Sequence, residues 1–165
     1  MDSDELVETL EAMPADDRDG AAADEEKVRY FIFTVCGASY ALPPSAIKEI
    51  ASDLEVFPVP ACPPYVPGLV NCHGVPHTVF DLRVLFESER HRAGTFLVLN
   101  LDSDDVAFGC TEVDEIAEFP VSCLSTFAAR DSEARFFAAM IELPGRRIPV
   151  LSVERILQTL ENDLA

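Results

Sequence analysis

The stretch PGLVNCHGVPHTVFDLRVLF, residues 67–86, decides the fold class. Two short apolar runs, 68–72 and 75–80, flank a turn at Gly74, which is the pattern of a β-hairpin. Residues 82–86 continue with apolar side chains at the spacing of a helical turn. The stretch therefore predicts a hairpin whose second strand runs directly into a short helix.

From residue 28 onward the chain repeats this pattern of short strands separated by turn residues, which is typical of an all-β barrel or sandwich. Pro43-Pro44 and Pro144-Gly145 are among the turn signals. A longer helical pattern occurs only at 152–164, and one face of it is apolar. That face consists of Val153, Ile156, Leu157, Leu160 and Leu164. We expect a mainly β domain that ends in a helix.

The β region also contains a weak internal repeat. Residues 40–51 align without a gap on 106–117 and share four identical residues with them. Residues 77–86 align on 148–157, and in both copies a strand runs into a helix. Two matched blocks in the same order indicate a duplicated β unit. Each unit alone would be marginal in size, so we expect the two to pack as one rigid body.

Charge separates the first residues from the rest. The 165-residue chain has a formal net charge of -18, with eleven acids and one base in residues 1–26. We expect a flexible acidic tail at 1–27, with a short helix around Leu6, Leu10 and Met13 that forms only on contact as the alternative. The acidity opposes binding to nucleic acid or anionic lipid. No secretion signal or membrane-spanning run is evident, which predicts a cytoplasmic protein without direct membrane insertion.

Cysteine and histidine in the opening stretch raise the question of a metal site. Pro76 excludes a helix that would bring His73 and His77 together, and four residues of extended strand separate them by roughly 13 Å. Two imidazoles on one zinc need nitrogens about 2 Å from the metal. The local spacing thus predicts no metal site, although distant ligands such as Cys62 or Cys110 could still converge.

A catalytic Cys–His dyad is the other reading of the same residues. Cys72 lies in an apolar strand, without the helix N-terminus or cationic neighbour that activates a thiol. On a continuous strand Cys72 and His73 would point to opposite faces. The five cysteines, Cys36, Cys62, Cys72, Cys110 and Cys123, are an odd number without a C-x-x-C motif. We expect small buried residues in a reducing compartment, and neither catalysis nor a cofactor.

With its upstream context, the stretch resembles the CheW-like domain of bacterial chemotaxis coupling proteins. The family signature runs Y-x-[IL]-P, V-x-E-I, V-P-x-x-P-x-[FY]-x-x-G-[VL]-x-N-x-R-G and D-L-R. The resemblance covers about residue 28 to the C-terminus. The matching positions are Tyr40, Ile47, Glu49, Ile50, Pro60, Pro63 or Pro64, Tyr65, Gly68, Asn71, Gly74, Asp81, Leu82 and Arg83.

The departures from the family pattern lie at four positions. His73 stands where the family usually has arginine, and Thr78 where a proline is common. Thr111 and Ser152 replace two customary aspartates. The apolar frame survives these changes, so we expect them to affect partner recognition rather than the fold. His73 is the most informative, because the arginine belongs to the surface with which family members meet receptors.

The resemblance implies two SH3-like five-stranded β-barrels packed side by side, with a C-terminal helix. It places the CheW-like domain at 28–165, with a first barrel at about 28–92, a second at about 93–151 and the helix at 152–164. It also implies a non-catalytic scaffold that couples chemoreceptors to a chemotaxis histidine kinase in two-component signal transduction.

The implied partners are the kinase regulatory domain and the cytoplasmic tip of a chemoreceptor, which would recruit the protein to membrane receptor arrays. By position, the implied receptor-facing residues are Ile47, Glu49, Gly68, Asn71 and His73, with packing or solvation as the alternative for the first three. Asp81 and Arg83 are expected to hold a strand-to-helix junction.

Two rival functions remain open. One is a divergent CheW paralogue that serves a non-flagellar or twitching-type pathway, or that binds kinase without receptor. The other is a metal-responsive or redox-responsive binding module that uses the cysteines and histidines.

Overall fold

The computed structural model describes residues 25–87, 94–126 and 135–164. Most of the expected tail at 1–27 lies outside the described residues, as do Leu6, Leu10 and Met13. Lys27 already belongs to the first strand.

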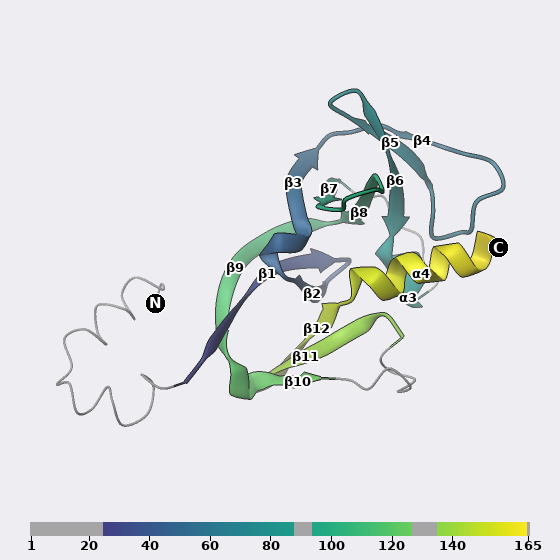
Figure 1. Cartoon of the computed structure of the whole chain (residues 1–165). Coiled ribbons are helices and arrows are strands. Elements are labelled where there is room, and N and C mark those ends of the chain that lie inside the picture. The colour runs from purple at the N-terminus through teal and green to yellow at the C-terminus, as the bar shows by residue number, and fades with distance from the viewer. Residues whose placement is uncertain (1–24, 88–93, 127–134, 165) are drawn as a thin grey trace, which may run out of the picture.

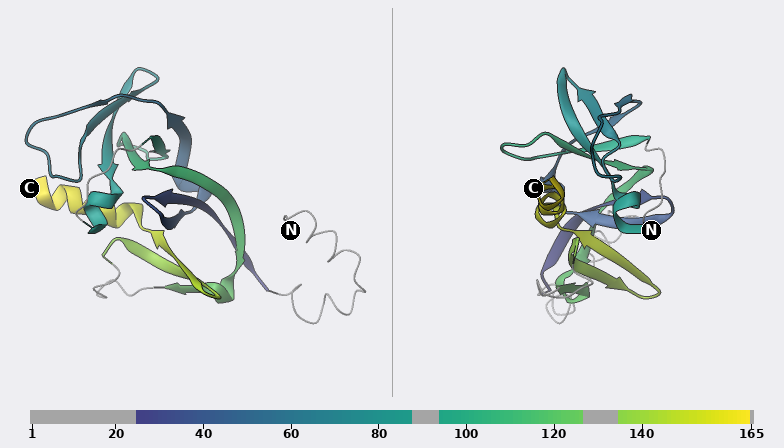
Figure 2. Two further views of the ribbon diagram at one scale, coloured as in Figure 1. Left: turned by 180° about the vertical axis from the view of Figure 1, so that it is seen from behind. Right: turned by 90° about the vertical axis from the view of Figure 1, so that its right-hand side faces the viewer.

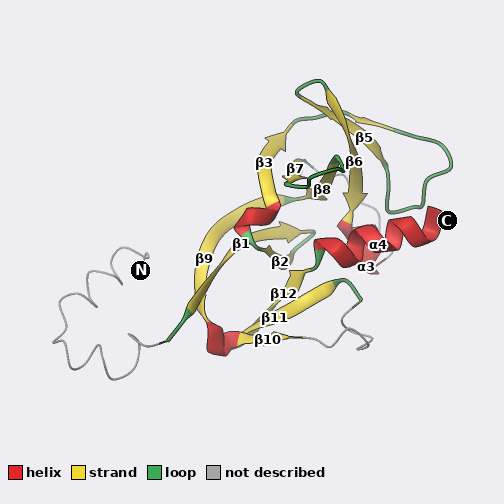
Figure 3. Cartoon of the chain, viewed as in Figure 1, coloured by secondary structure: helices red, strands yellow, loops and turns green. Residues whose placement is uncertain are grey.

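Strands dominate the described part of the chain, and the longest helix is the last element (Figures 1 and 3). The helical elements are the 3-10 turns η2 (Pro44–Ala46) and η3 (Val121–Cys123) and the helices α3 (Leu82–Glu87) and α4 (Val153–Leu164). The strands are β1 (Lys27–Val35), β2 (Ala38–Leu42), β3 (Ile47–Ser52), β4 (Val56–Phe57), β5 (Gly68–Cys72), β6 (Val75–Asp81), β7 (Thr95–Leu99), β8 (Val106–Cys110), β9 (Glu112–Pro120), β10 (Leu124–Thr126), β11 (Phe137–Leu143) and β12 (Arg146–Leu151).

The strands form two sheets. Sheet A has the order β10-β11-β12-β2-β1-β9, and sheet B has the order β3-β7-β8-β6-β5-β4. The mainly β fold with a C-terminal helix is confirmed, and each sheet contains six strands rather than the expected five. Sheet B occupies the upper half of Figure 1, sheet A the lower half, and α4 runs between them in both views of Figure 2.

The internal repeat is visible in the strand order. Reading sheet A from β10 and sheet B from β4 gives the same succession of edge strand, hairpin, hairpin and edge strand. One parallel pair joins the hairpins in each sheet, with Val150 opposite Ala41 in sheet A and Val79 opposite Ala107 in sheet B. Ala41 aligns with Ala107, and Val79 with Val150, in the two repeats of the sequence. The duplication predicted from the sequence is therefore present in the strand register.

The expected barrel boundaries need correction, because each sheet takes strands from both repeats. The first repeat contributes β1 and β2 to sheet A and β3–β6 to sheet B, while the second contributes β7 and β8 to sheet B and β9–β12 to sheet A. The ranges 28–92 and 93–151 thus approximate the repeats but not the two sheets. The chain crosses between sheets from β2 to β3 and from β8 to β9, and β9 is the long curved strand in Figure 1.

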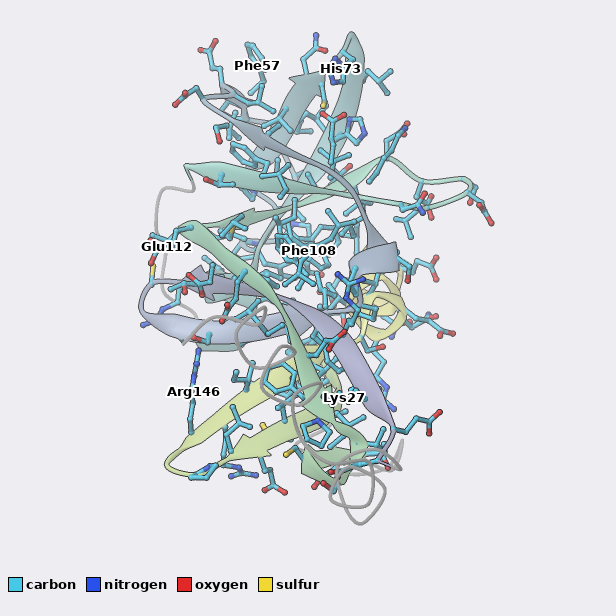
Figure 4. All side chains as sticks on the ribbon, turned by 90° about the vertical axis from the view of Figure 1, so that its left-hand side faces the viewer. Lys27, Phe57, His73, Phe108, Glu112 and Arg146 are labelled. Carbon is cyan, nitrogen blue, oxygen red and sulfur yellow. The ribbon has the colours of Figure 1, made fainter. Side chains whose placement is uncertain are left out.

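The largest apolar core lies where the two sheets meet. It contains Phe33 of β1, Phe80 of β6 and Phe108 of β8, all fully buried, together with Ile156 of α4. Phe108 lies in the middle of the molecule among packed side chains in Figure 4. Each sheet also has a smaller apolar cluster of its own. The cluster in sheet A includes Ile141, and the cluster in sheet B includes Val70 and Phe96. The shared core explains why neither repeat needs to be stable alone.

Candidate functional site

The receptor-facing residues implied by the resemblance come from three places in sheet B. Ile47 and Glu49 belong to β3, Gly68 and Asn71 to β5, and His73 to the turn that joins β5 to β6. Asn71 and His73 are exposed, whereas Gly68 is buried. His73 lies at the outer end of sheet B, at the top of Figure 4, whereas Arg146 of sheet A lies in the lower part of the same view.

Glu49 and His73 are brought together although they belong to distant strands. The His73 Nε2 atom lies 2.9 Å from Oε1 of Glu49 and 3.1 Å from Oε2, distances at which an N–H group donates to a carboxylate. In the strand order, three strands separate β3 from β5. A side-chain contact across that interval shows that sheet B curls on itself, so that its first strand approaches its fifth.

Cys72 completes this cluster, contrary to the geometry expected for a continuous strand. Its Sγ donates to Oε1 of Glu49 at 2.9 Å. Cys72 and His73 therefore do not point to opposite faces. His73 has a φ of 52° and Gly74 a φ of 82°, which is the two-residue hairpin turn that needs positive φ at both central positions. This turn swings the imidazole to the side of the sheet that carries the thiol.

Hydrogen bonding within the cluster shifts two pKa values in opposite directions. The bond from the Cys72 thiol, followed by the nearby His73, lowers the pKa of Glu49 against the opposing effect of desolvation. Burial, together with the bond to the Glu49 carboxylate, raises the pKa of Cys72 to about 11. The thiol thus stays protonated near neutral pH, which does not suit a nucleophile.

The other carried-over residues have structural surroundings of different kinds. Ile47 is half-buried, pairs with Leu99 of β7 and packs against the shared core. A Cβ atom built on Gly68 would lie 2.1 Å from the carbonyl oxygen of Phe57 and 2.9 Å from Cα of Pro58. Only glycine lets β5 approach β4 this closely. These contacts are consistent with packing roles for Ile47 and Gly68.

An apolar groove of about 200 Å³ begins beside Gly68, at the end of β5 away from His73. Its walls come from the connection between β4 and β5, from β6 and from α4. The lining residues are Val59, Cys62, Pro63, Val66, Gly68, Leu69, Thr78 and Leu160. Phe57 and Val59, close by in sequence, are 52% and 38% exposed. The groove and these two side chains give this end of the molecule apolar surface that a protein partner can bury.

The junction residues Asp81 and Arg83 lie where β6 ends and α3 begins. Oδ1 of Asp81 accepts hydrogen bonds from the backbone N–H groups of Arg83 at 3.0 Å and Val84 at 3.3 Å. This is the N-cap arrangement, in which a side chain satisfies the first free donors of a helix. The N–H of Asp81 also donates to the carbonyl of Tyr65 at 2.7 Å, which ties the β4–β5 connection to the same junction.

Sequence reasoning missed the contact that attaches α4. The Tyr65 hydroxyl donates to Oδ2 of Asp163 at 2.5 Å, and burial, with Asp163 beside it, raises the pKa of Tyr65. A second cavity of about 400 Å³ lies beside this pair and is also lined by Arg135 and Phe136. The residues are 98 apart in the chain, and no local pattern connects them.

His77, which the sequence singled out with His73, does not join the cluster. It is buried in β6, and its Nδ1 lies 2.9 Å from the carbonyl of Val75. Its Nε2 lies 3.8 Å from Asp105.

None of the helices within residues 25–87, 94–126 and 135–164 has the length and apolar character of a membrane-spanning segment.

Comparison with known proteins identifies the domain. A sequence model of the CheW-like domain matches residues 29–161. Among solved structures, the crystal structure of the scaffolding protein TtCheW from Thermoanaerobacter tengcongensis is similar, with a TM-score of 0.68 and 14% sequence identity over 78% of this chain and 90% of that chain. No curated protein sequence matches.

The two matches support different conclusions. The structural likeness, at this identity, shows a common fold. The family match covers most of the described residues and includes both sheets and most of α4. The chain therefore belongs to the CheW-like domain family, whose members are non-catalytic scaffolds of chemotaxis signalling.

Proposed function

We propose that this protein couples the cytoplasmic tip of a chemoreceptor to the regulatory domain of a chemotaxis histidine kinase. The observation that carries the proposal is the contact between Glu49 and the exposed His73, because His73 occupies the position of the arginine on the family's receptor-facing surface. The hairpin of β5 and β6 carries His73 in its turn, and Gly68 and Thr78 of the same hairpin line the apolar groove. Membership of a scaffold family supports protein partners in general.

The shape and chemistry of this end of the molecule suit a helical partner. A receptor tip presents ridges of helix side chains, and such ridges dock in an apolar groove with polar groups at its rim. The groove supplies the apolar part, with Leu69 and Leu160 among its walls. The exposed Asn71, two residues after Leu69 on β5, supplies a polar group on the same face of the strand, and the Glu49–His73 pair lies at the far end of the hairpin.

His73 favours a second candidate within the same class, a divergent paralogue with its own receptor. Arginine presents five donors and a permanent charge, whereas histidine offers one N–H in its neutral form. In this structure the Nε2 atom of His73 is already engaged by Glu49. The receptor residue that faces His73 would then differ from the residue that faces arginine in the receptors of other family members.

The kinase regulatory domain would bind a different surface, as the resemblance implies. The protein would work in the bacterial cytoplasm and would be recruited to receptor arrays through its partners. Receptor-site variants should therefore leave kinase binding unchanged.

Titration of the full chain against a receptor-tip fragment and a kinase regulatory-domain fragment tests the proposal. Glu49→Ala should weaken receptor binding on the order of tenfold or more, the loss expected for a charge-assisted hydrogen bond. Glu115→Gln is the matched control, because Glu115 is the exposed repeat counterpart of Glu49 on β9. Unchanged receptor affinity in Glu49→Ala, or no binding of either fragment, would contradict the proposal.

A further inference from the structure

The cluster of Glu49, Cys72 and His73 contains three different metal-binding groups in one place. Their ligand atoms, a carboxylate oxygen, a thiol sulfur and an imidazole nitrogen, all lie within 4.8 Å of one another. We propose that this cluster binds one thiophilic divalent transition-metal ion, of which Zn²⁺ is the best fit, through three protein ligands with a fourth position open. The scaffold function assigns no metal to these residues.

The distances between the ligand atoms support this coordination. In a tetrahedral zinc site, ligand atoms at about 2.0–2.3 Å from the metal are separated by about 3.3–3.7 Å from one another. Here Oε1 of Glu49 lies 2.9 Å from Sγ of Cys72 and 2.9 Å from Nε2 of His73. Each of these pairs needs to open by roughly half an ångström to accept the ion. The half-buried carboxylate of Glu49 and the exposed imidazole of His73 can make that adjustment by side-chain rotation.

The main chain already holds the ligands in place. Cys72 is the last residue of β5 and pairs with Val75 of β6 across the tight turn that contains His73. Glu49 comes from β3, at the opposite edge of the sheet order. β3 and β5 are not neighbours in sheet B, so no backbone hydrogen bonds of the sheet pair them. A metal ion on these ligands would link the two strands. Such a crosslink exists only in the folded protein, so binding should stabilise the fold.

Charge balance also favours the ion. Binding requires the Cys72 thiol to lose its proton to solvent, after which a thiolate and a carboxylate neutralise the two charges of the metal and the imidazole stays neutral. Cys72 is buried, with 5% of its surface exposed, while the side chain of His73 is 79% exposed. The ion can thus enter from solvent on the His73 side, and the thiolate would be shielded beneath it.

Soft and borderline ligands distinguish the class of ion. Thiolate and imidazole select zinc and its neighbours over magnesium and calcium, which take oxygen ligands. The alternative is that the thiol and the imidazole only share the Glu49 carboxylate through the hydrogen bonds seen in this structure. In that case no metal will bind at this place with measurable affinity.

Cobalt substitution provides the direct test, on the full chain purified with chelator and then freed of it. Co²⁺ added alone should bind with one-to-one stoichiometry and give the thiolate-to-metal charge-transfer band and the intense visible bands of a tetrahedral site. Zn²⁺ should displace it. Cys72→Ser should abolish the charge-transfer band, while Cys36→Ser, which removes an exposed cysteine, should keep it.

His73→Asn supplies a variant whose folding is safe, since the side chain is exposed and asparagine tolerates positive φ. It should weaken Zn²⁺ binding by about tenfold or more, because loss of even an outer-shell partner costs 10- to 100-fold. Absence of the charge-transfer band, or wild-type affinity in both Cys72→Ser and His73→Asn, would overturn the proposal.

Metal binding is measured on the isolated chain, so it does not depend on the scaffold function. If both proposals hold, an ion on Glu49 and His73 would alter the receptor-facing surface, and Zn²⁺ would change receptor affinity in wild type but not in Cys72→Ser. Metal binding without any receptor binding would leave the metal site standing and refute the scaffold function.

Discussion

The substitution Gly68→Ala should destabilise the protein strongly, although it adds only one methyl group. The added Cβ would lie 2.1 Å from the carbonyl oxygen of Phe57, where real Cβ atoms essentially never approach a backbone atom closer than 3.0 Å. The obstacle is backbone, so no side-chain rotation can relieve it. The β4–β5 pairing of Phe57 with Leu69 would have to open.

The magnitude follows from two costs. Overpacking a well-packed site costs about 1–3 kcal/mol, and a positive φ adds about 1–2 kcal/mol for a residue with a Cβ. The two costs together predict that the free energy of unfolding falls by about 2–5 kcal/mol, and that Tm falls by roughly 4–20 °C for a protein of this size.

Urea denaturation of Gly68→Ala and Gly74→Ala decides the matter. Gly74 also has positive φ, but a Cβ there meets nothing within 4 Å, so only the backbone cost applies. Gly68→Ala should therefore lose about 1–3 kcal/mol more than Gly74→Ala. Equal losses in the two variants would refute the close-approach argument. They would reopen a direct partner-binding role as the reason for glycine at position 68.

Three further predictions concern single side chains. Asp81→Ala should lower the free energy of unfolding by about 0.5–2 kcal/mol in urea, with Asp81→Asn closer to wild type, because both oxygen-bearing side chains can cap α3. The pKa of Tyr65 is raised from 10.0, so the folded protein holds the phenol proton more tightly than the unfolded chain. The stability that this proton contributes should therefore be intact below pH 10 and be lost as pH rises through the folded-state pKa. Denaturation curves measured from pH 8 to 11 should show a smaller decline in Tyr65→Phe than in wild type. Cys72 is buried and has a pKa of about 11, so at neutral pH and with chelator present it should react with iodoacetamide far more slowly than the exposed Cys36. Mass spectrometry of the digested protein measures the two rates.

Much of the fold is predictable because its signals are local. Proline and glycine mark the strand ends, and the apolar stripe at 152–164 predicts α4, observed at Val153–Leu164. The two aligned blocks of sequence predict the duplication, and the structure places Ala41 and Ala107 in equivalent registers. The resemblance to the CheW-like domain, drawn from the spacing around residues 40–83, is confirmed by the family match.

The exchange of strands between the repeats was not predictable by the same means. A duplicated sequence has the same alignment whether each copy forms its own sheet or contributes strands to both. Which occurs depends on the sheet that β3 joins after the turn at Pro43 and on the sheet that β9 joins after β8, and long-range packing decides both. The sequence therefore predicts a boundary near residue 92, between the repeats, whereas sheet B includes β7 and β8 from the second repeat.

The candidate site illustrates the same limit at the level of side chains. A continuous strand at 71–74 would place the side chains of Cys72 and His73 on opposite faces of the sheet. The positive φ of His73 instead turns its side chain to the face that carries Cys72. The His73-Gly74 pair at the centre of a predicted hairpin was a usable signal for this turn. The third member, Glu49, lies 23 residues before Cys72. Their contact depends on the curl of sheet B, which no local pattern encodes.

A three-component capture assay measures whether this protein joins a chemoreceptor tip to a kinase regulatory domain. A kinase regulatory-domain fragment is immobilised, a receptor-tip fragment is supplied in solution, and capture of the receptor fragment is measured with and without the full chain. We expect capture of the receptor fragment only when the chain is present, with less capture for Glu49→Ala and undiminished capture for Glu115→Gln. Failure of the chain to join the two fragments, or competition between them for one surface of the folded protein, would contradict this expectation.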